Sequence, residues 1–316
     1  MIERLAAVIL TLLVTSGSPG AQEYPSRVIR VVVGPGPDIV ARLFAPRMSE
    51  ALGQQVVIEP RPGAGGVIAA QTIATAQPDG YNLLLATASY TINTALKTSP
   101  YDMRKDFSPI GRMSISPFVL VVHLSVAAKT VQELIALAKS KPGQLNYASS
   151  GIGTPPHLAG ELFKAMAGID IVHVPFREAN SALNAVVGGN VQMMFSIATT
   201  AQSQIEAGTV RGLGVTTLEP TRLVPNIRSV AQSDLPGFEV TGWNGLVAPA
   251  GTPSSIIAKL NSALRRGFDD ADTRKRLETA GYEVAAPSTP EDFAGFIKTD
   301  TERWIGIVEK ANISMK

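Results

Sequence analysis

The chain has 316 residues, 17% of them charged, a formal net charge of +2 and no cysteine. This length is natural for two domains, and the lack of cysteine excludes disulfides, thiol catalysis and a lipid anchor on an N-terminal cysteine. Because the net charge is small and no block of Lys or Arg occurs, nucleic acid is not expected as a partner.

The first 21 residues predict a cleaved export signal. Arg4 precedes an apolar run at residues 5–14, which is followed by small and turn-forming residues up to Ala21. The run is about half the length that a membrane-spanning helix needs. We therefore expect a mature chain that begins near Ala21 or Gln22 and resides in the periplasm, with an uncleaved anchor as the alternative.

After Pro25, short β-branched runs alternate with amphipathic segments, which predicts a largely parallel sheet flanked by helices. The expected strands cover residues 28–33, 56–59, 83–87, 117–123, 145–149, 171–174, 191–195, 213–216 and 242–248. The expected helices run from Asp38 to Gly53 and over residues 66–76, 130–140, 155–167 and 181–187. Only helices are expected after residue 248, with capped starts at Thr252-Pro253 and Thr289-Pro290.

The strands at 117–123 and 242–248 are expected to cross between two domains. One domain then comprises residues 22–120 and 243–316, and the other comprises residues 121–242. Two crossings also predict a cleft between the domains, where a ligand can bind.

The sequence lacks the common catalytic motifs, which predicts a protein that is not an enzyme. His123, His157 and His173 lack zinc-site spacing, and neither Ser149 nor Ser150 lies in a nucleophile elbow. No metal or cofactor is expected. His123 and His173 lie in apolar strands and are interpreted as structural, whereas His157 follows a Gly-rich turn and is a site candidate. The alternative is a periplasmic hydrolase that uses His157 with Ser149 or Ser150.

Four turns rich in Gly, Ser, Thr and Pro join a strand end to a helix start, at residues 34–38, 87–91, 149–154 and 175–181. The first N–H groups of a helix lack internal acceptors and favour an anion, so each turn is a candidate carboxylate site. Turning and capping alone also explain this composition. Arg177 is the cation of these turns, and it can pair with a ligand or with Glu178.

Several ordered segments then point to a known family. They are Tyr24-Pro25, Asp38 to Arg42, Arg61 to Gly66, Pro78 to Tyr81, Leu145 to Ser149, His157 to Glu161, His173 to Phe176, and Gly245 to Pro253. Over nearly its whole mature length the chain resembles the substrate-binding proteins of tripartite tricarboxylate transporters, often called the Bug family. The resemblance implies a two-lobed, type II Venus-flytrap fold. It also implies capture of a small organic carboxylate, mainly by backbone groups, hydroxyls and waters, and delivery to membrane permease subunits, for which a monomer is sufficient.

The ligand-binding residues that the turns and the resemblance imply are Gly34, Pro35, Gly36, Pro37, Thr87, Ser89, Tyr90, Ser149, Ser150, Gly151, Gly153, Thr154, His157, Phe176, Arg177 and Ser196. Tyr90 and Phe176 are interpreted either as an apolar wall of the site or as ordinary partly buried aromatics. The first turn is shorter than is usual in the family. Ser196 stands where the family often has an acid, which favours a plain carboxylic acid over an amino acid if this position faces the cleft. A signalling role in place of transport is a further alternative.

Overall fold

The computed structural model describes residues 24–34, 38–61, 66–233 and 235–310, so the predicted export signal and residues 35–37 lie outside the described residues. The strands are β1 Ile29–Val33, β2 Val56–Pro60, β3 Asn82–Thr87, β4 Phe107–His123, β5 Asn146–Ser149, β6 Val172–Pro175, β7 Met193–Ile197, β8 Val210–Val215, β9 Thr241–Pro249 and β10 Glu283–Val284. The helices are α1 Ile39–Leu52, α2 Val67–Ala74, α3 Ala88–Ala95, α4 Val131–Ser140, α5 Pro155–Ala167, α6 Ala179–Val187, α7 Ala198–Glu206, α8 Val230–Ser233, α9 Ser254–Asp269, α10 Ala271–Thr279 and α11 Pro290–Lys310. Within these ranges, no helix has the length and apolarity that crossing a bilayer requires.

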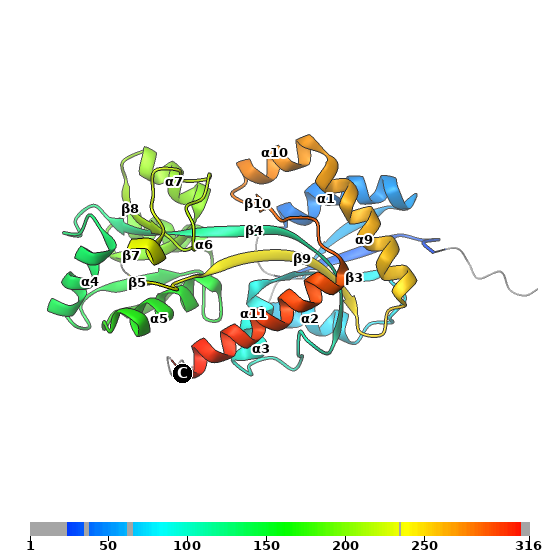
Figure 1. Cartoon of the computed structure of the whole chain (residues 1–316), viewed down its shortest axis with the longest axis horizontal. Coiled ribbons are helices and arrows are strands. Elements are labelled where there is room, and N and C mark those ends of the chain that lie inside the picture. The colour runs from blue at the N-terminus through cyan, green and yellow to red at the C-terminus, as the bar shows by residue number, and fades with distance from the viewer. Residues whose placement is uncertain (1–23, 35–37, 62–65, 234, 311–316) are drawn as a thin grey trace, which may run out of the picture.

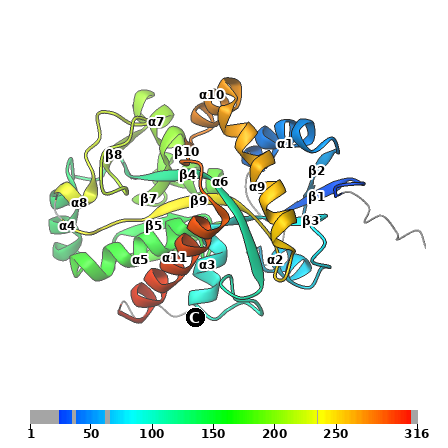
Figure 2. The same cartoon turned by 45° about the vertical axis from the view of Figure 1, so that its right-hand side comes forward.

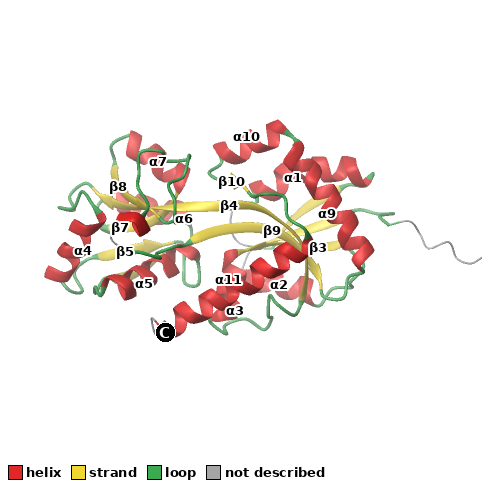
Figure 3. Ribbon diagram, in the orientation of Figure 1, coloured by secondary structure: helices red, strands yellow, loops and turns green. Residues whose placement is uncertain are grey.

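The strands pair in the order β2-β1-β3-β9-β4-β7-β5-β6, and β8 and β10 also pair with β4. Strands β1, β2 and β3 are parallel, as are β5, β6 and β7. Helices flank each parallel set, which gives two α/β lobes side by side (Figure 1, Figure 3). We call the lobe with β1–β3 the first lobe and the lobe with β5–β7 the second lobe. The predicted fold class is confirmed.

Two long strands, β4 and β9, join the lobes. β4 pairs with β9 along residues 107–117 and with β7 along residues 118–122. Both strands cross from one lobe to the other in two views of the molecule (Figure 1, Figure 2). Strands were predicted at both crossings, although β4 already begins at Phe107. The domain boundaries at 120/121 and 242/243 remain predictions.

The last helix, α11, reaches the hydrophobic cores of both lobes. Its start has the predicted cap, because the Asp292 N–H donates to Thr289 Oγ1 and the Thr289 N–H donates to Asp292 Oδ2, each at 3.1 Å. Phe293 packs edge-on against Trp243 of β9, with ring centroids 5.6 Å apart. Near the other end of α11, Trp304 is fully buried in the core of the second lobe. The helix is therefore a third connection between the lobes.

Two local predictions were wrong. β10 follows residue 248 and pairs with β4, so this part of the chain is not only helical. Thr252 does not cap α9, because its hydroxyl donates to the Pro249 carbonyl at 2.8 Å and the helix begins one residue after Pro253. Asp38 occupies the N-cap position of α1, where its side chain makes no cap hydrogen bond and its carboxylate pairs with Arg42 at 2.6 Å.

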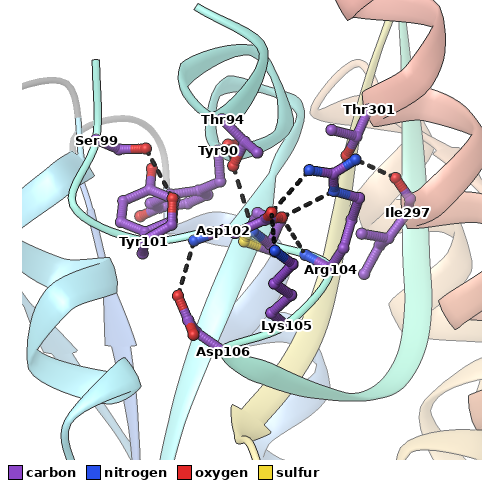
Figure 4. A network of polar contacts seen from close by, with 11 residues as sticks. Tyr90, Thr94, Ser99, Tyr101, Asp102, Arg104, Lys105, Asp106, Ile297 and Thr301 are labelled. Carbon is purple, nitrogen blue, oxygen red and sulfur yellow. Dashed lines mark hydrogen bonds and ion pairs between the residues drawn. The ribbon is translucent and has the colours of Figure 1, made fainter. Parts of the chain in front are cut away.

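The segment between α3 and β4 is held by a polar network (Figure 4). The Asp102 carboxylate accepts hydrogen bonds from Arg104 at 2.9 Å and 2.7 Å, which lowers the pKa of Asp102 below its ordinary value. The Asp102 N–H donates to Asp106 Oδ2 at 2.8 Å. The Met103 N–H donates to Thr94 Oγ1 on α3 at 3.3 Å. The network therefore fixes α3, whose first turn belongs to the candidate site.

Candidate ligand-binding site

The first turn of α3 carries uncapped N–H groups at the end of β3. Thr87 occupies the N-cap position with extended backbone (φ −135°, ψ 168°), and its side chain makes no cap hydrogen bond. Ser89 is half-buried in this turn. Because the first N–H groups of a helix have no intrahelical acceptor, this end of α3 offers donors to an anion.

Tyr90 lies beneath the backbone of two glycines and is only 2% exposed. A Cβ on Gly34 would lie 2.4 Å from the Tyr90 hydroxyl oxygen, and a Cβ on Gly66 would lie 2.9 Å from its ring. A backbone hydrogen bond joins Gly34 to the hydroxyl, and burial raises the pKa of Tyr90 above its ordinary value. Tyr90 therefore supports the end of β1 from the core. The neighbouring predicted residues Pro35, Gly36 and Pro37 lie outside the described residues.

A row of neutral polar side chains crosses three adjacent strands next to this turn. Thr87 of β3 pairs in register with Asn244 of β9, which pairs in turn with Ser114 of β4. Cross-strand partners share one face of a sheet, and the neighbouring Trp243 packs under α11, so the row lies on the opposite face. Asn244 Nδ2 donates to Ser114 Oγ at 3.0 Å, and both side chains are buried. The row can offer hydroxyl and amide groups without adding charge.

Residues 149–154 form the turn between β5 and α5, which we call the β5–α5 turn. Its backbone is left-handed at Gly151 (φ +121°) and Gly153 (φ +75°). Ser149 is fully buried, and its Oγ accepts from the Gly151 N–H at 3.1 Å. Thr154 Oγ1 donates to the Gly151 carbonyl at 2.6 Å, while Ser150 is half-buried. The polar groups of the turn thus largely satisfy one another.

The start of α5 offers fewer amide donors than the start of α3. Pro155 and Pro156 occupy its first two positions and have no N–H. The Gly153 N–H donates to His157 Nδ1 at 3.2 Å, and the Thr154 N–H donates within the turn to the Gly151 carbonyl. Helix α7, which follows β7, starts without a proline and without a side-chain cap. Free amide donors are therefore expected at α3 and α7 more than at α5.

Three stacked rings lie behind the β5–α5 turn. His157 of α5 stacks on His173 of β6 with ring centroids 4.2 Å apart, and His173 stacks on Tyr147 of β5 at 4.8 Å. His173 Nε2 lies 2.6 Å from Ser149 Oγ. The Tyr147 hydroxyl donates to Glu161 Oε1 at 2.6 Å. The stack thus contacts the turn at two points, through one nitrogen of each imidazole.

Both imidazoles of the stack favour the neutral form. Burial is the largest cause that lowers the pKa of His157, and Glu161 opposes it. Burial, and after it the neighbouring His157, lowers the pKa of His173 to about 4. Burial followed by the Glu161 charge raises the pKa of Tyr147 far above its ordinary value. At neutral pH His157 Nδ1 is therefore able to accept the Gly153 N–H.

The remaining predicted residues follow β6 or lie on β7. The Phe176 N–H donates to the Ser149 carbonyl at 2.9 Å, and the half-buried Phe176 ring packs beside the core. Arg177 is exposed and makes no ion pair with any residue that the structure describes, Glu178 included. Ser196 is buried and pairs in register with Val119, which places its side chain on the core face under α6 and α7.

The lobes meet where the β5–α5 turn approaches α3. A Cβ on Gly153 would lie 2.9 Å from Asn93 Oδ1. Ser149 bonds to His173 and not to His157, so the predicted hydrolase pair is not assembled. Two surface hollows, one beside α10 and one beside Tyr24, contain none of the predicted residues. Across the described segments, no three His, Cys, Asp or Glu side chains are placed to hold a metal ion.

Sequence reasoning missed four residues that the structure brings to this region: Asn93, Ser114, His173 and Asn244. His173 was interpreted as structural, and the other three were not considered. A signal was present for Asn244, a lone amide between Trp243 and Gly245 in an otherwise apolar strand. Asn93 and Ser114 have no comparable signal, because their relevance depends on which strands and turns become neighbours.

Residues 40–313 match the model of the TctC family, described as the tripartite tricarboxylate transporter family receptor. The chain belongs to this receptor family. BugT of Bordetella pertussis is 30% identical over 325 residues, which cover 99% of each chain. The resemblance to the Bug family is therefore confirmed.

Two solved structures resemble this TctC-family receptor closely. One is an R. palustris protein with adipate, at a TM-score of 0.83 and 30% identity, over 92% of this chain and 99% of that one. The other is MatC of Rhodopseudomonas palustris with bound malate, at a TM-score of 0.81 and 33% identity, over 90% of this chain and 100% of that one. Both molecules named with these structures are dicarboxylic acids.

Proposed function

We propose that the chain is a periplasmic receptor that captures a small dicarboxylate between its lobes and delivers it to the membrane subunits of a tripartite transporter. The observation that carries the proposal is the uncapped start of α3 beside the neutral row Thr87, Asn244 and Ser114. The adipate and malate complexes of its relatives agree with this chemistry.

Helix starts and neutral donors are sufficient to hold a carboxylate. One helix N-terminus stabilises an anion by about 0.3–1 kcal/mol when exposed and up to about 2 kcal/mol when partly buried. The α3 and α7 starts together therefore supply an appreciable part of the binding free energy. Arg177 is exposed at the start of α6 and is proposed to pair with a second carboxylate.

We infer capture and release, with no chemical change of the ligand. Ser149 Oγ bonds to His173 and to the Gly151 N–H, so this hydroxyl already has its partners within the protein. A ligand that contacts both lobes only when they are closed shifts the population toward the closed form. The family match favours delivery to membrane subunits over a signalling role. The predicted signal at residues 1–21 supports export to the periplasm.

Dicarboxylates are expected to stabilise the mature protein against heat. A ligand at ten times its Kd adds about 1.4 kcal/mol to the free energy of unfolding, which raises Tm of a chain of this size by about 2 °C. The measurement is a thermal-shift screen of protein stripped of carried-over ligand, with C3–C10 dicarboxylates, citrate, aromatic acids and amino acids. A panel without any carboxylate shift, or with shifts from amino acids alone, contradicts the proposal.

The double change Ser114→Ala and Asn244→Leu is expected to weaken dicarboxylate binding about tenfold with little loss of stability. Replacing both partners of a buried hydrogen bond is nearly neutral for folding, whereas the ligand loses polar contacts. Calorimetric titration gives Kd, and urea unfolding gives the stability. The matched control is Asn184→Leu on the exposed side of α6, which should bind as the wild type does. Unchanged affinity in the double variant would show that Ser114 and Asn244 do not contact the ligand.

A further inference from the structure

We propose that His157 and His173 are positioning residues, whose neutral imidazoles hold both ends of the β5–α5 turn in its binding conformation, and that protonation of His157 releases the turn. The inference rests on the proposed function, because it assigns a role within the same site. It differs from direct ligand contact by His157, since the ring nitrogens in question bond to the protein.

The two contacts lie at opposite ends of the turn. His173 Nε2 is 2.6 Å from Ser149 Oγ, where the turn leaves β5. His157 Nδ1 accepts the Gly153 N–H at 3.2 Å, where the turn enters α5. Between them, the turn has no regular ladder and passes through the left-handed Gly151. The two imidazoles therefore hold the ends of the turn, while hydrogen bonds of Ser149 and Thr154 to Gly151 hold its middle.

The stack fixes the position of both imidazoles. His157 and His173 lie 4.2 Å apart with ring planes 27° from parallel, and Tyr147 closes the far side of His173. Gly160 makes room for the Tyr147 ring, because a Cβ there would lie 2.1 Å from a ring carbon. The Tyr147 hydroxyl is held by Glu161, which also pairs with Lys164 at 3.1 Å. Rings that cannot rotate freely define the positions of Ser149 and Gly153.

The contact at Gly153 also bears on the approach of the lobes. Gly153 faces Asn93 of α3, at a distance that leaves no space for a side chain. If Gly153 moves, the surface that the second lobe presents to α3 changes. Holding Gly153 thus prepares the turn to meet the first lobe and a ligand between them.

Protonation is expected to break this arrangement. A protonated His157 carries a proton on Nδ1 and cannot accept the Gly153 N–H. A second charge 4.2 Å from the first repels it, so the stack accommodates at most one proton readily. The charged groups that act on the two rings are Glu161, which favours protonation, and Lys164, which opposes it. Both pKa values lie below the ordinary histidine value, so the turn is held at neutral pH and is released only in acid, below the pH at which an ordinary histidine gains its proton.

Two kinds of substitution at His157 and His173 distinguish a positioning role from a role that only fills space. His157→Asn keeps an acceptor near the place of Nδ1, and His173→Gln keeps a polar atom near Nε2, whereas His157→Leu and His173→Leu keep only bulk. With adipate as the probe at pH 7.5, the leucine variants are expected to bind about tenfold more weakly than the wild type. The asparagine and glutamine variants are expected to stay within about threefold. Equal losses in both kinds of variant would overturn the proposal.

The pH dependence of adipate binding separates the two roles, because residues that only fill space would leave it unchanged. Adipate itself gains protons in acid, so the comparison is between the wild type and the double variant His157→Asn, His173→Gln at the same pH. Between pH 7.5 and 4, the wild type is expected to lose about tenfold more affinity than the double variant. Parallel profiles would overturn the proposal.

Hydrogen exchange of the ligand-free protein distinguishes this proposal from the proposed function. At pH 7, amides of residues 149–154 are expected to exchange about tenfold faster in His157→Leu than in His157→Asn. This result supports the positioning role whether or not an acid of the panel binds. Absence of binding to the whole panel would overturn only the proposed function. Equal exchange in both variants overturns the positioning role even if adipate binds.

Discussion

Replacing Asp300 with alanine is expected to lower the free energy of unfolding by about 3 kcal/mol. Asp300 lies on α11 and is 5% exposed. Its Oδ2 accepts from the Thr91 hydroxyl at 2.6 Å and from Trp243 Nε1 at 3.0 Å, and its Oδ1 accepts from Arg303 at 3.2 Å. Alanine leaves Trp243 Nε1 buried without its acceptor, which costs about 1–3 kcal/mol, whereas the Thr91 hydroxyl keeps the Ala88 carbonyl at 2.9 Å as an acceptor. The partly buried Arg303 also loses one ion-pair partner. Urea unfolding of the variant measures the loss.

Two matched variants test whether the buried acceptor causes this loss. Asp300→Asn keeps one acceptor oxygen, and we expect it to lose about 1 kcal/mol. Asp272→Ala removes an exposed carboxylate 3.6 Å from Arg276, and we expect a change within about 0.5 kcal/mol. If Asp300→Ala unfolds at the same urea concentration as Asp272→Ala, the network around Asp300 does not stabilise the fold.

The change Gly160→Ala is expected to lower the free energy of unfolding by about 2 kcal/mol and to weaken ligand binding as well. The new Cβ would lie between 2.1 Å and 2.6 Å from three atoms of the Tyr147 ring, so this ring must move. His173 stacks on the same ring and bonds to Ser149. A displaced Tyr147 therefore disturbs the β5–α5 turn. Urea unfolding and a titration with adipate measure the two effects.

Gly295→Ala is the matched control, because it is also a glycine-to-alanine change inside a helix. No heavy atom lies within 4 Å of a Cβ at Gly295. Alanine has the higher helix propensity, so this variant is expected to be more stable by about 0.5–1 kcal/mol. If both variants gain stability, the ring of Tyr147 adjusts without cost and the stack is not rigid.

The elements that the sequence predicted well are those with strong local signals at both ends. The predicted helix at 155–167 matches α5, which starts with two prolines and ends at Gly168 in a left-handed conformation. Helix α10 was missed because its sequence has hardly any apolar stripe, with only Thr273 and Leu277 buried. β10 was missed because two residues carry no period, and only their pairing with β4 makes them a strand.

For the candidate site, sequence reasoning found the turns but not what holds them. Each turn has a local composition that predicts a helix start, so Thr87 and Ser149 were placed correctly at strand ends. The row of Asn244 and Ser114 depends on the antiparallel register of two strands that are far apart in the chain. His173 lies in an apolar strand, and only the tertiary fold brings its ring against His157 and Ser149.

The two ends of the described chain lie on different lobes, which suggests a way to observe lobe movement. Tyr24, the first described residue, is bonded to the first lobe at two points. Its hydroxyl donates to the Gly80 carbonyl, and the Lys259 ammonium donates to the Tyr24 carbonyl. α11 carries the other end of the chain to the second lobe, where Trp304 is buried (Figure 1). Fluorophores attached near Tyr24 and near Trp304 would therefore lie on different lobes. Energy transfer between the two fluorophores would change when the lobes move relative to each other, and ligand binding could then be followed as an optical signal.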